Sequence, residues 1–317
     1  MILALRPQIV TVLLGLFALW PASVNAGATP EQVKEFESYK AKAEKGDAKS
    51  QSILGFHYYT GLGVPKDAVE AGKWYRKAAE QGFALAQYNL GFMYANGEGV
   101  PKDAVEAVKW YRKAVEQGNV LAQSNLGAMY AKGEGVPKDP VEAVKWYRKA
   151  AEQGDAIAQY NLGLMYAKGE GVPKDAVEAV KWYRKAAEQG NAIAQYNLGF
   201  MYANGEGVPK DAVEAAKWYR KAADQGVAHA QVNLGFMYAN GEGVPKDQVE
   251  AYAYWNLAGI TDELARKKLA ILEKQMSPDA RLLGQQRTKQ LQKEIEGRLE
   301  STEEVRKAIE KERIKGA

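Results

Sequence analysis

The chain has 317 residues, with 43 lysine and arginine residues against 39 aspartate and glutamate residues and a net charge of +4. A balance this close to neutral argues against a nucleic-acid binder, because such proteins usually concentrate positive charge on one face. The sequence contains no cysteine, which excludes disulfides, thiol catalysis, thiolate metal sites and the lipid-anchored type of bacterial signal.

The N-terminus has the layout of a removable signal peptide, which we place at residues 1–26. Arg6 supplies a positive charge, and an apolar stretch from Ile9 to Trp20 is too short to span a bilayer comfortably. Val24-Asn25-Ala26 then offers small or apolar residues for cleavage before Gly27. We therefore expect an exported protein, periplasmic or secreted, with no stable membrane span after the signal is removed. An uncleaved N-terminal anchor is the alternative.

The next segment, residues 27–47, precedes the main pattern of the chain. Residues 34–44 are charged and alanine-rich, and they predict an entry helix. From residue 48 to residue 260 the sequence repeats six times with a period of 36. Two sets of residues recur with this period. One set is Pro65, Pro101, Pro137, Pro173, Pro209 and Pro245, and the other is Trp74, Trp110, Trp146, Trp182 and Trp218. A fixed period of this size indicates a solenoid whose units pack on their neighbours.

One unit, residues 84–118, shows how each repeat is expected to fold. Its first helix, called helix A, covers residues 84–95. The apolar positions of helix A share one face: Ala86, Leu90, Met93 and Tyr94. Gly91 lies at the edge of that face, where the missing side chain lets a neighbouring helix approach. In the following turn, Gly97 and Gly99 permit positive φ, and Pro101 prevents the helix from continuing.

The second helix of the unit, called helix B, begins after a strong start signal. Asp103 is the expected N-cap, and Glu106 three residues later completes a capping-box pattern. Trp110 and Tyr111 stand among small alanines, as closely stacked helices require. Gly118 is expected to end the helix. An Asn or Asp at the next position of the repeat then caps the following helix A.

The recurring residues resemble those of the Sel1-like repeat family, a subfamily of the tetratricopeptide class. The residues that carry the resemblance are Ala86, Leu90-Gly91, Tyr94, Gly97-Glu98-Gly99-Val100, Asp103, Ala107, Trp110-Tyr111, Lys113-Ala114 and Gln117-Gly118. We expect an all-α fold, a right-handed α/α solenoid of stacked helix-turn-helix repeats. The resemblance implies an adaptor that holds other proteins together in signalling, secretion or envelope assembly.

The period stops past residue 261, and residues 261–290 are expected to cap the array. A helix over residues 263–275 has its apolar positions at Leu264, Leu269, Leu272 and Met276, and Ser277-Pro278-Asp279 predicts the start of another helix. Residues 291–317 form a charged helical tail with an apolar stripe at Leu291, Ile295 and Leu299. This tail is either a solvated helix or a coiled-coil or docking helix.

The sequence offers no catalytic constellation, and we expect no metal and no cofactor. The two histidines, His57 and His229, lie almost five repeats apart, and His57 falls on the core-facing side of its helix A. The loops that contain Gly-Glu-Gly-Val-Pro-Lys lack the ending of a phosphate-binding loop, so we interpret them as helix–helix turns. Trp110 and Tyr111 are interpreted as core residues in preference to an aromatic cage for a ligand.

A second face of helix A is the candidate binding surface, which tetratricopeptide-type stacks place on the concave side. Tyr88 and Phe92 lie opposite the core face, and their neighbouring asparagine suits recognition of a peptide backbone. The candidate residues are Tyr88, Asn89, Phe92, Asn125, Ala128, Asn161, Leu164, Asn197, Phe200, Asn233 and Phe236. Ser124 and Ala128 replace larger residues at the centre of the array, which predicts a shallow dent there.

These patterns favour an exported, non-enzymatic adaptor that binds a protein or peptide partner. One alternative is a hydrolase acting on cell-wall or β-lactam substrates, which rests on family analogy alone. The family members linked to that activity are cysteine-rich, and this chain has no cysteine. A second alternative is a self-assembling structural protein, since near-identical units can stack end to end if the array ends are weakly capped.

Overall fold

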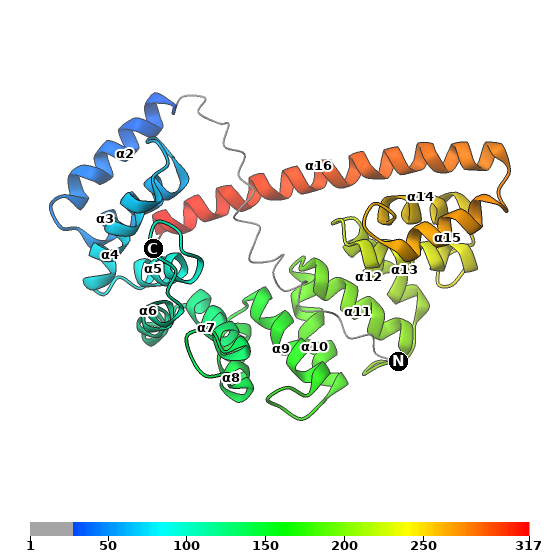
Figure 1. Cartoon of the computed structure of the whole chain (residues 1–317), viewed down its shortest axis with the longest axis horizontal. Helices are drawn as coiled ribbons and strands as arrows, with labels where there is room; N and C mark the ends of the chain where they lie inside the picture. Colours follow the sequence, from blue (N-terminus) through cyan, green and yellow to red (C-terminus); the bar gives the residue numbers. More distant parts are fainter. Residues whose placement is uncertain (1–27, 317) are drawn as a thin grey trace.

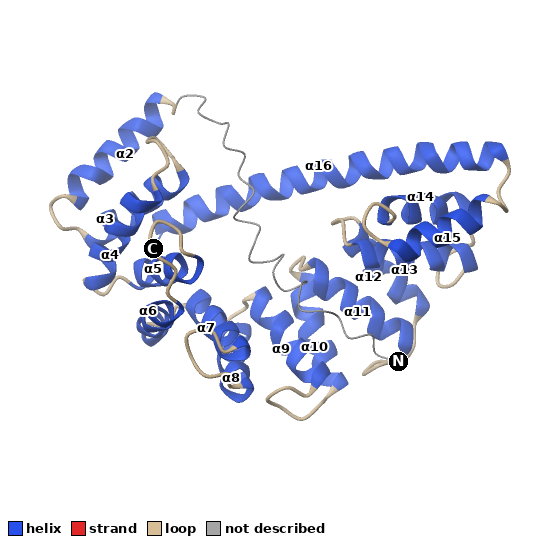
Figure 2. Ribbon diagram, viewed as in Figure 1, coloured by secondary structure: helices blue, strands red, loops and turns tan. Residues whose placement is uncertain are grey.

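The computed structural model describes residues 28–316, with side chains up to Ser301. Within that range the chain forms helices and loops without a strand (Figure 2). The helices stack into an open arc, and the long C-terminal helix runs across its open side (Figure 1). The fold is therefore an all-α solenoid. The expected signal peptide lies outside the described residues.

Two series of helices alternate along the arc. Helices A are α3 (Ala48–Thr60), α5 (Ala84–Asn96), α7 (Val120–Lys132), α9 (Ala156–Lys168), α11 (Ala192–Asn204) and α13 (Ala228–Asn240). Helices B are α4 (Ala68–Glu80), α6 (Ala104–Glu116), α8 (Pro140–Glu152), α10 (Ala176–Glu188), α12 (Ala212–Ala223) and α14 (Gln248–Ala258). Each helix A packs on the helix B that follows it and on the helix B that precedes it.

The entry helix α2 (Pro30–Ala43) begins four residues earlier than residue 34, where the sequence predicted its start. Thr29 explains the earlier start, because its hydroxyl accepts a hydrogen bond from the backbone N–H of Gln32, and the Gln32 side chain accepts one from Thr29. Phe36 and Ala43 of this helix are buried against α3. The helix thus takes the place of a helix B before the first repeat.

The turn between helix A and helix B follows the prediction. Gly97 ends α5 in the left-handed conformation with φ of 75°, and Gly99 has φ of 67°. A Cβ atom on Gly99 would lie 2.0 Å from the carbonyl oxygen of Ala68, at the start of the preceding helix B. Gly99 is therefore required both by its backbone conformation and by close contact with the neighbouring repeat.

Of the two hydrogen bonds in the predicted capping box at the start of helix B, only the one accepted by the aspartate side chain forms. The Asp103 carboxylate accepts hydrogen bonds from the backbone N–H groups of Val105 and Glu106, at 2.9 and 3.0 Å. The reciprocal bond from Glu106 does not form, so that part of the prediction was wrong. The N–H of Asp103 donates instead to the carbonyl of Tyr94, and the Glu106 carboxylate pairs with Lys109. The backbone N–H of Asp103 therefore bonds across the preceding turn to Tyr94 and not to the side chain of Glu106.

The buried core is offset from the sequence repeat. One cluster combines Tyr75 of α4, Leu90 of α5 and Trp110 of α6, so it joins two consecutive helices B to the helix A between them. Tyr111 is also buried, and a Cβ atom on Gly91 would lie 2.8 Å from its ring. The interpretation of Trp110 and Tyr111 as core residues is confirmed.

The same close contact recurs in each unit: a glycine of helix A leaves a notch that accepts a tyrosine of helix B in the first five units and Trp255 in the last. Gly163 faces Tyr183 at the same 2.8 Å, measured from an added Cβ atom to the ring. We expect Gly163→Ala to lower the free energy of unfolding by about 1–3 kcal/mol, because it overpacks the contact. Gly297→Ala is the matched control, since a Cβ atom at Gly297 in α16 meets nothing within 4 Å.

Thermal and urea unfolding monitored by circular dichroism measures both variants. Gly297→Ala should be as stable as the parent chain or more stable, because alanine favours a helix over glycine by about 0.5–1 kcal/mol. A Gly163→Ala variant as stable as the parent would contradict the notch as a packing constraint.

A buried glutamine in four of the helices A forms hydrogen bonds to residues of the helix before it and at the end of the helix after it. The Gln87 side chain donates to the carbonyl of Ala79 at 3.2 Å and accepts from Gln117 Nε2 at 2.8 Å. Equivalent pairs of bonds are made by Gln51, Gln159 and Gln195. Sequence reasoning missed this ladder, because nothing in a helical pattern shows that a polar side chain is buried with its partners.

We expect Gln159→Ala to cost about 1–3 kcal/mol of unfolding free energy, because it leaves the buried carbonyl of Ala151 without its hydrogen-bond donor. The control is Gln189→Ala, which removes the exposed end of the same chain of bonds and leaves that carbonyl satisfied. If the two substitutions lower the free energy of unfolding in urea by the same amount, the buried hydrogen bond to Ala151 does not stabilise the array more than the exposed one.

The array ends in two helices that pack on α14. They are α15 (Glu263–Glu273) and α16 (Pro278–Gly316), and α16 continues without a break through residue 290. Ser277 Oγ accepts from the N–H of Ala280, which confirms the predicted start. Leu272 and Met276 are buried as predicted, but Leu264 is 48% exposed and Ala265 is buried in its place. Ala265 lies on the same helical stripe as Leu269, Leu272 and Met276, whereas Leu264 is one position away from that stripe.

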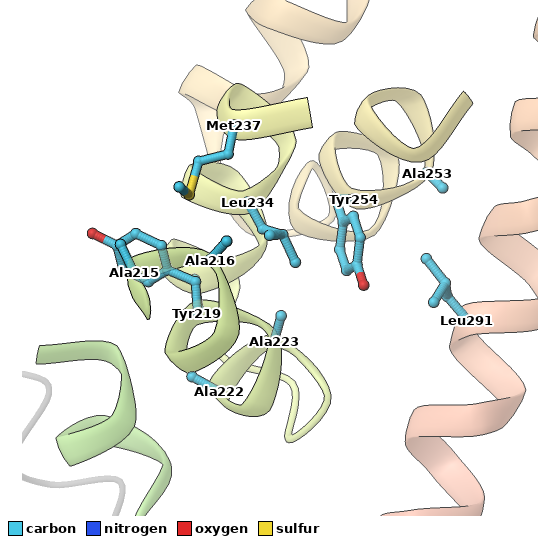
Figure 3. Packing of buried hydrophobic residues seen from close by; sticks show 11 residues of the cluster. Ala215, Ala216, Tyr219, Ala222, Ala223, Leu234, Met237, Ala253, Tyr254 and Leu291 are labelled. Carbon is cyan, nitrogen blue, oxygen red and sulfur yellow. The ribbon is translucent and has the colours of Figure 1, made fainter. Parts of the chain in front are cut away.

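The last repeat has adapted its helix B to receive α16. Lysine and tryptophan of the earlier units are replaced by Ala253 and Tyr254, and Leu291 of α16 packs into the same cluster (Figure 3). Trp255 takes the place of the notch tyrosine and donates from Nε1 to the carbonyl of Val232 at 3.0 Å. Arg287 of α16 pairs with Glu250 at 2.6 Å. Leu299, the last residue of the predicted stripe, is 46% exposed.

Candidate partner-binding surface

The candidate residues all lie on helices A and form rows that recur once per repeat. Ten of the eleven are partly buried, and Phe200 is exposed. The ten are Tyr88, Asn89, Phe92, Asn125, Ala128, Asn161, Leu164, Asn197, Asn233 and Phe236. The predicted second face of helix A is therefore a half-covered surface, and its three kinds of residue have different surroundings.

The tyrosines of this face pack against the core. The ring of Tyr88 lies 6.0 Å from that of Tyr111, measured between centroids, and Tyr160 lies 6.0 Å from Tyr183. Burial raises the pKa of Tyr160 and of Tyr183. These phenols therefore lose their protons only at a higher pH than an exposed tyrosine does, and the rings of Tyr160 and Tyr183 pack against each other.

The asparagines are partly engaged within the array. Asn125 Nδ2 donates to the hydroxyl of Tyr111 at 3.2 Å, from one repeat to the next. Asn197 stands in the same relation to Tyr183: burial raises the pKa of Tyr183, and the hydrogen bond from Asn197 opposes that rise. One amide contact therefore serves the stacking of repeats, a role that the sequence pattern did not reveal.

The remaining row consists of Phe92, Ala128, Leu164, Phe200 and Phe236, one residue per repeat. Phe236 packs edge-on against Trp255 at 5.2 Å, and Lys268 Nζ lies 5.0 Å from the centre of its ring. Ala128 and Leu164 pack at the margins of buried clusters. Phe200 differs from all of them, because its side chain is 42% exposed. Among the Phe, Tyr and Trp residues of the range 28–301, it is the one that is exposed.

At the centre of the array, where a dent was predicted, a partly buried hydrogen bond joins two repeats. Ser124 is 6% exposed, and its hydroxyl donates to the Asp155 carboxylate at 3.1 Å. That carboxylate also caps α9 by accepting from the N–H of Ala158. The small side chain at this position thus links one helix A to the next.

Helices B carry a row of cations above aromatic rings, which sequence reasoning did not identify. Each arginine donates to the tyrosine hydroxyl 18 residues later, in the next helix A, and the pairs are Arg76–Tyr94, Arg112–Tyr130, Arg148–Tyr166, Arg184–Tyr202 and Arg220–Tyr238. Lys77 Nζ lies 3.9 Å above the ring of Trp74. The constant separation of 18 residues was the signal that could have found these pairs.

Two shallow hollows lie beside these cations. One has a volume of about 380 Å³ and is lined by Trp74, Arg76 and Lys77 among others, and the second has about 340 Å³ around Trp146. Glutamates line both hollows, so they present both signs of charge. Neither hollow includes a residue of the candidate surface.

His57 and His229 occupy separate environments. His57 is buried, with Nδ1 2.6 Å from the carbonyl oxygen of Leu62 and its ring between Phe36 and Tyr39, which confirms it as a core residue. His229 is half-exposed, 3.6 Å from the Asp262 carboxylate. Across the described part of the chain, no group of three or more His, Cys, Asp or Glu side chains is arranged to hold a metal ion.

The Sel1 repeat model matches residues 48–83, 84–119, 120–155, 156–191, 192–227 and 228–259. The chain belongs to the Sel1 repeat family. This Sel1 repeat array is similar to the crystal structure of c5321, a protective antigen of uropathogenic Escherichia coli with an SLR fold, at 41% identity and a TM-score of 0.73. The match covers 80% of this chain and 56% of c5321, so it spans little more than half of that protein.

A Sel1 repeat protein from Oxalobacter formigenes is similar over 72% of this chain and 96% of its own, at 40% identity and a TM-score of 0.62. No curated protein matches the chain. None of the helices in the described range is both long enough and apolar enough to cross a membrane.

Proposed function

We propose that this Sel1 repeat protein is an exported, non-enzymatic scaffold that binds a peptide or helix of a protein partner on the second face of its helices A. Sel1 repeat arrays typically mediate protein–protein interactions, and they are generally not enzymes. The proposal adds the surface, the absence of catalysis and the location, periplasmic or secreted, which rests on the signal-like sequence of residues 1–26.

The exposure of Phe200 is the observation that carries the proposal. Moving a phenylalanine ring out of water lowers the free energy. Every other Phe, Tyr and Trp side chain in residues 28–301 is at least partly buried. Aromatic side chains in such positions are common anchors of protein interfaces. Phe200 lies on α11, within the array and away from both of its ends.

The rows around Phe200 suit an extended or helical partner. Leu164 and Phe236 occupy the equivalent positions one repeat before and one repeat after it, so a partner lying along the array meets a similar side chain at each step. Asn197 lies near Phe200 on the same helix, and its amide keeps hydrogen-bonding capacity beyond its bond to Tyr183. This combination provides apolar anchoring and backbone recognition.

We expect Phe200→Glu to weaken partner binding about tenfold or more, because it places a charge where an apolar contact forms. The bait is the chain 27–317, which carries every described element, and captured proteins from native envelope extract are identified by mass spectrometry. Affinity for the captured partner is then measured by calorimetry. Val177→Glu is the matched control, since Val177 is 51% exposed but lies on helix B.

Phe236 is left unchanged in this design, because its contact with Trp255 makes it part of the terminal packing. A folded Phe200→Glu variant that binds the same partner with unchanged affinity would contradict the proposed surface. If the parent chain enriches no protein at all, the proposal of a protein partner fails, and a non-protein ligand such as peptidoglycan becomes the next candidate. Among the described residues, nothing favours the hydrolase alternative.

A further inference from the structure

The two ends of the Sel1 array differ in the polarity of their outer surfaces. At the N-terminal end, α2 buries Phe36 and Ala43 and exposes mostly charged or small residues, with Val33 as its one exposed large apolar side chain. A polar outer face is what a solenoid cap needs to remain soluble. The N-terminal end is therefore built to face water.

The C-terminal end exposes apolar side chains that a cap would be expected to hide. Five lie within 24 residues, and we call them the cap surface: Ile260 (76% exposed), Leu264 (48%), Ile271 (53%), Leu282 (55%) and Leu283 (53%). The other exposed apolar residues of the array are mainly single valines, one at the start of each of the first five helices B. Scattered apolar residues are ordinary on protein surfaces, whereas a concentration of them marks a contact site.

These side chains are not needed for packing within the chain. Other residues of the same helices, among them Ala265, Leu272, Met276 and Ala280, pack against the cluster formed by α14. Helices α15 and α16 are joined by the short turn of residues 274–277, so Ile271 and Leu282 both lie within two turns of helix of it. The cap surface therefore belongs to one end of the arc, at the right of Figure 1.

The charges around the cap surface are mixed and nearly balanced. Residues 260–283 carry Arg266, Lys267, Lys268, Lys274 and Arg281 against Asp262, Glu263, Glu273 and Asp279. An anionic membrane would favour a clear positive excess here, which this balance does not supply. A surface that carries both signs can meet a copy of itself without net repulsion and with opposite charges facing each other.

We propose that the cap surface is the contact between two copies of this chain, which pair through their C-terminal ends. The exposed apolar side chains gather at one end of the array, so pairing of two copies through them is a contact of one surface with itself, and a two-fold contact of this kind closes after two copies. Stacking of one chain's end on the other chain's start would instead produce a filament. This inference is independent of the partner surface around Phe200.

Sedimentation velocity of the chain 27–317 over a range of concentrations tests the proposal. We expect a reversible shift from one chain to two, and no larger species. The double variant Ile271→Glu/Leu282→Glu should stay a single chain at every concentration. The control Val105→Glu/Val141→Glu changes residues of equal exposure, 52% and 53%, on helices B and should pair like the parent.

Circular dichroism and thermal midpoints establish that each variant is folded. A parent chain that sediments as a single species of one chain at all concentrations would overturn the proposal. So would a pairing that the cap double variant leaves unchanged. Flotation of the parent chain with phosphatidylglycerol vesicles, lost in the cap variant, in the absence of pairing, would assign the surface to a membrane and would also overturn it.

The absence of cysteine allows a direct test of the geometry. A single Leu283→Cys substitution with a bis-maleimide reagent should give a covalent dimer, and Val105→Cys should not. A mixture of Leu283→Cys and Val33→Cys chains distinguishes the two arrangements. Links between unlike chains would indicate end-to-start stacking and contradict the two-fold contact, whereas links only between Leu283→Cys chains would support it.

Discussion

The contact between a glycine of helix A and an aromatic ring of helix B sets the geometry of each repeat, and that ring is a tyrosine in the first five repeats and Trp255 in the last. The ring of Tyr183 occupies the space above Gly163, where an added Cβ atom would lie 2.8 Å from the ring. This contact lets the two helices of a unit approach closely, and it fixes where helix B presents its neighbouring tryptophan. That tryptophan then packs on the preceding unit, so the geometry of one repeat is transmitted to the next.

The repeats are coupled by contacts that cross the sequence boundary between units. The buried clusters join one helix B, the next helix A and the tryptophan of the following helix B. The glutamine ladder and the arginine–tyrosine pairs span the same boundaries. A unit removed from its neighbours would expose the buried face on both sides, and this explains why α2 and α15–α16 are needed at the ends.

Much of this fold follows from local chemistry that a sequence displays directly. The period gave the repeated helix pairs, Gly97 and Gly99 indicated the turn, and Asp103 indicated the start of helix B. Features that depend on partners distant in the chain were not predictable. Gln87 reads as an ordinary polar residue until Ala79 and Gln117 are seen beside it. Leu264 and Ala265 are neighbours in the sequence, and the structure shows that the alanine is the one buried in the cluster with α14.

On the candidate surface, too, local sequence patterns were predictive, whereas contacts with residues distant in the chain were not. Helical periodicity identified the second face of helix A, including Phe200. It did not show that Asn125 bonds to Tyr111 or that Trp255 and Lys268 cover Phe236. The exchanged order Tyr254-Trp255 was visible in the sequence, but its effect is seen only in the structure. The larger ring of Trp255 fills the notch at Gly235 and contacts Phe236. Aromatic patches in several repeats and a dent at the centre were expected, and the surface has one clearly exposed phenylalanine, Phe200.

Native-state hydrogen exchange of the Gly163→Ala variant, resolved by peptide and compared with the parent chain, tests the central claim most directly. Gly163 lies in α9, and its contact with Tyr183 of α10 affects the clusters on both sides of that pair. We predict that amide protection falls most in α8 to α11 and recovers toward α2 and α16. An equal loss of protection along the whole array, or a loss confined to α9 and α10, would contradict an array held together by contacts between neighbouring repeats.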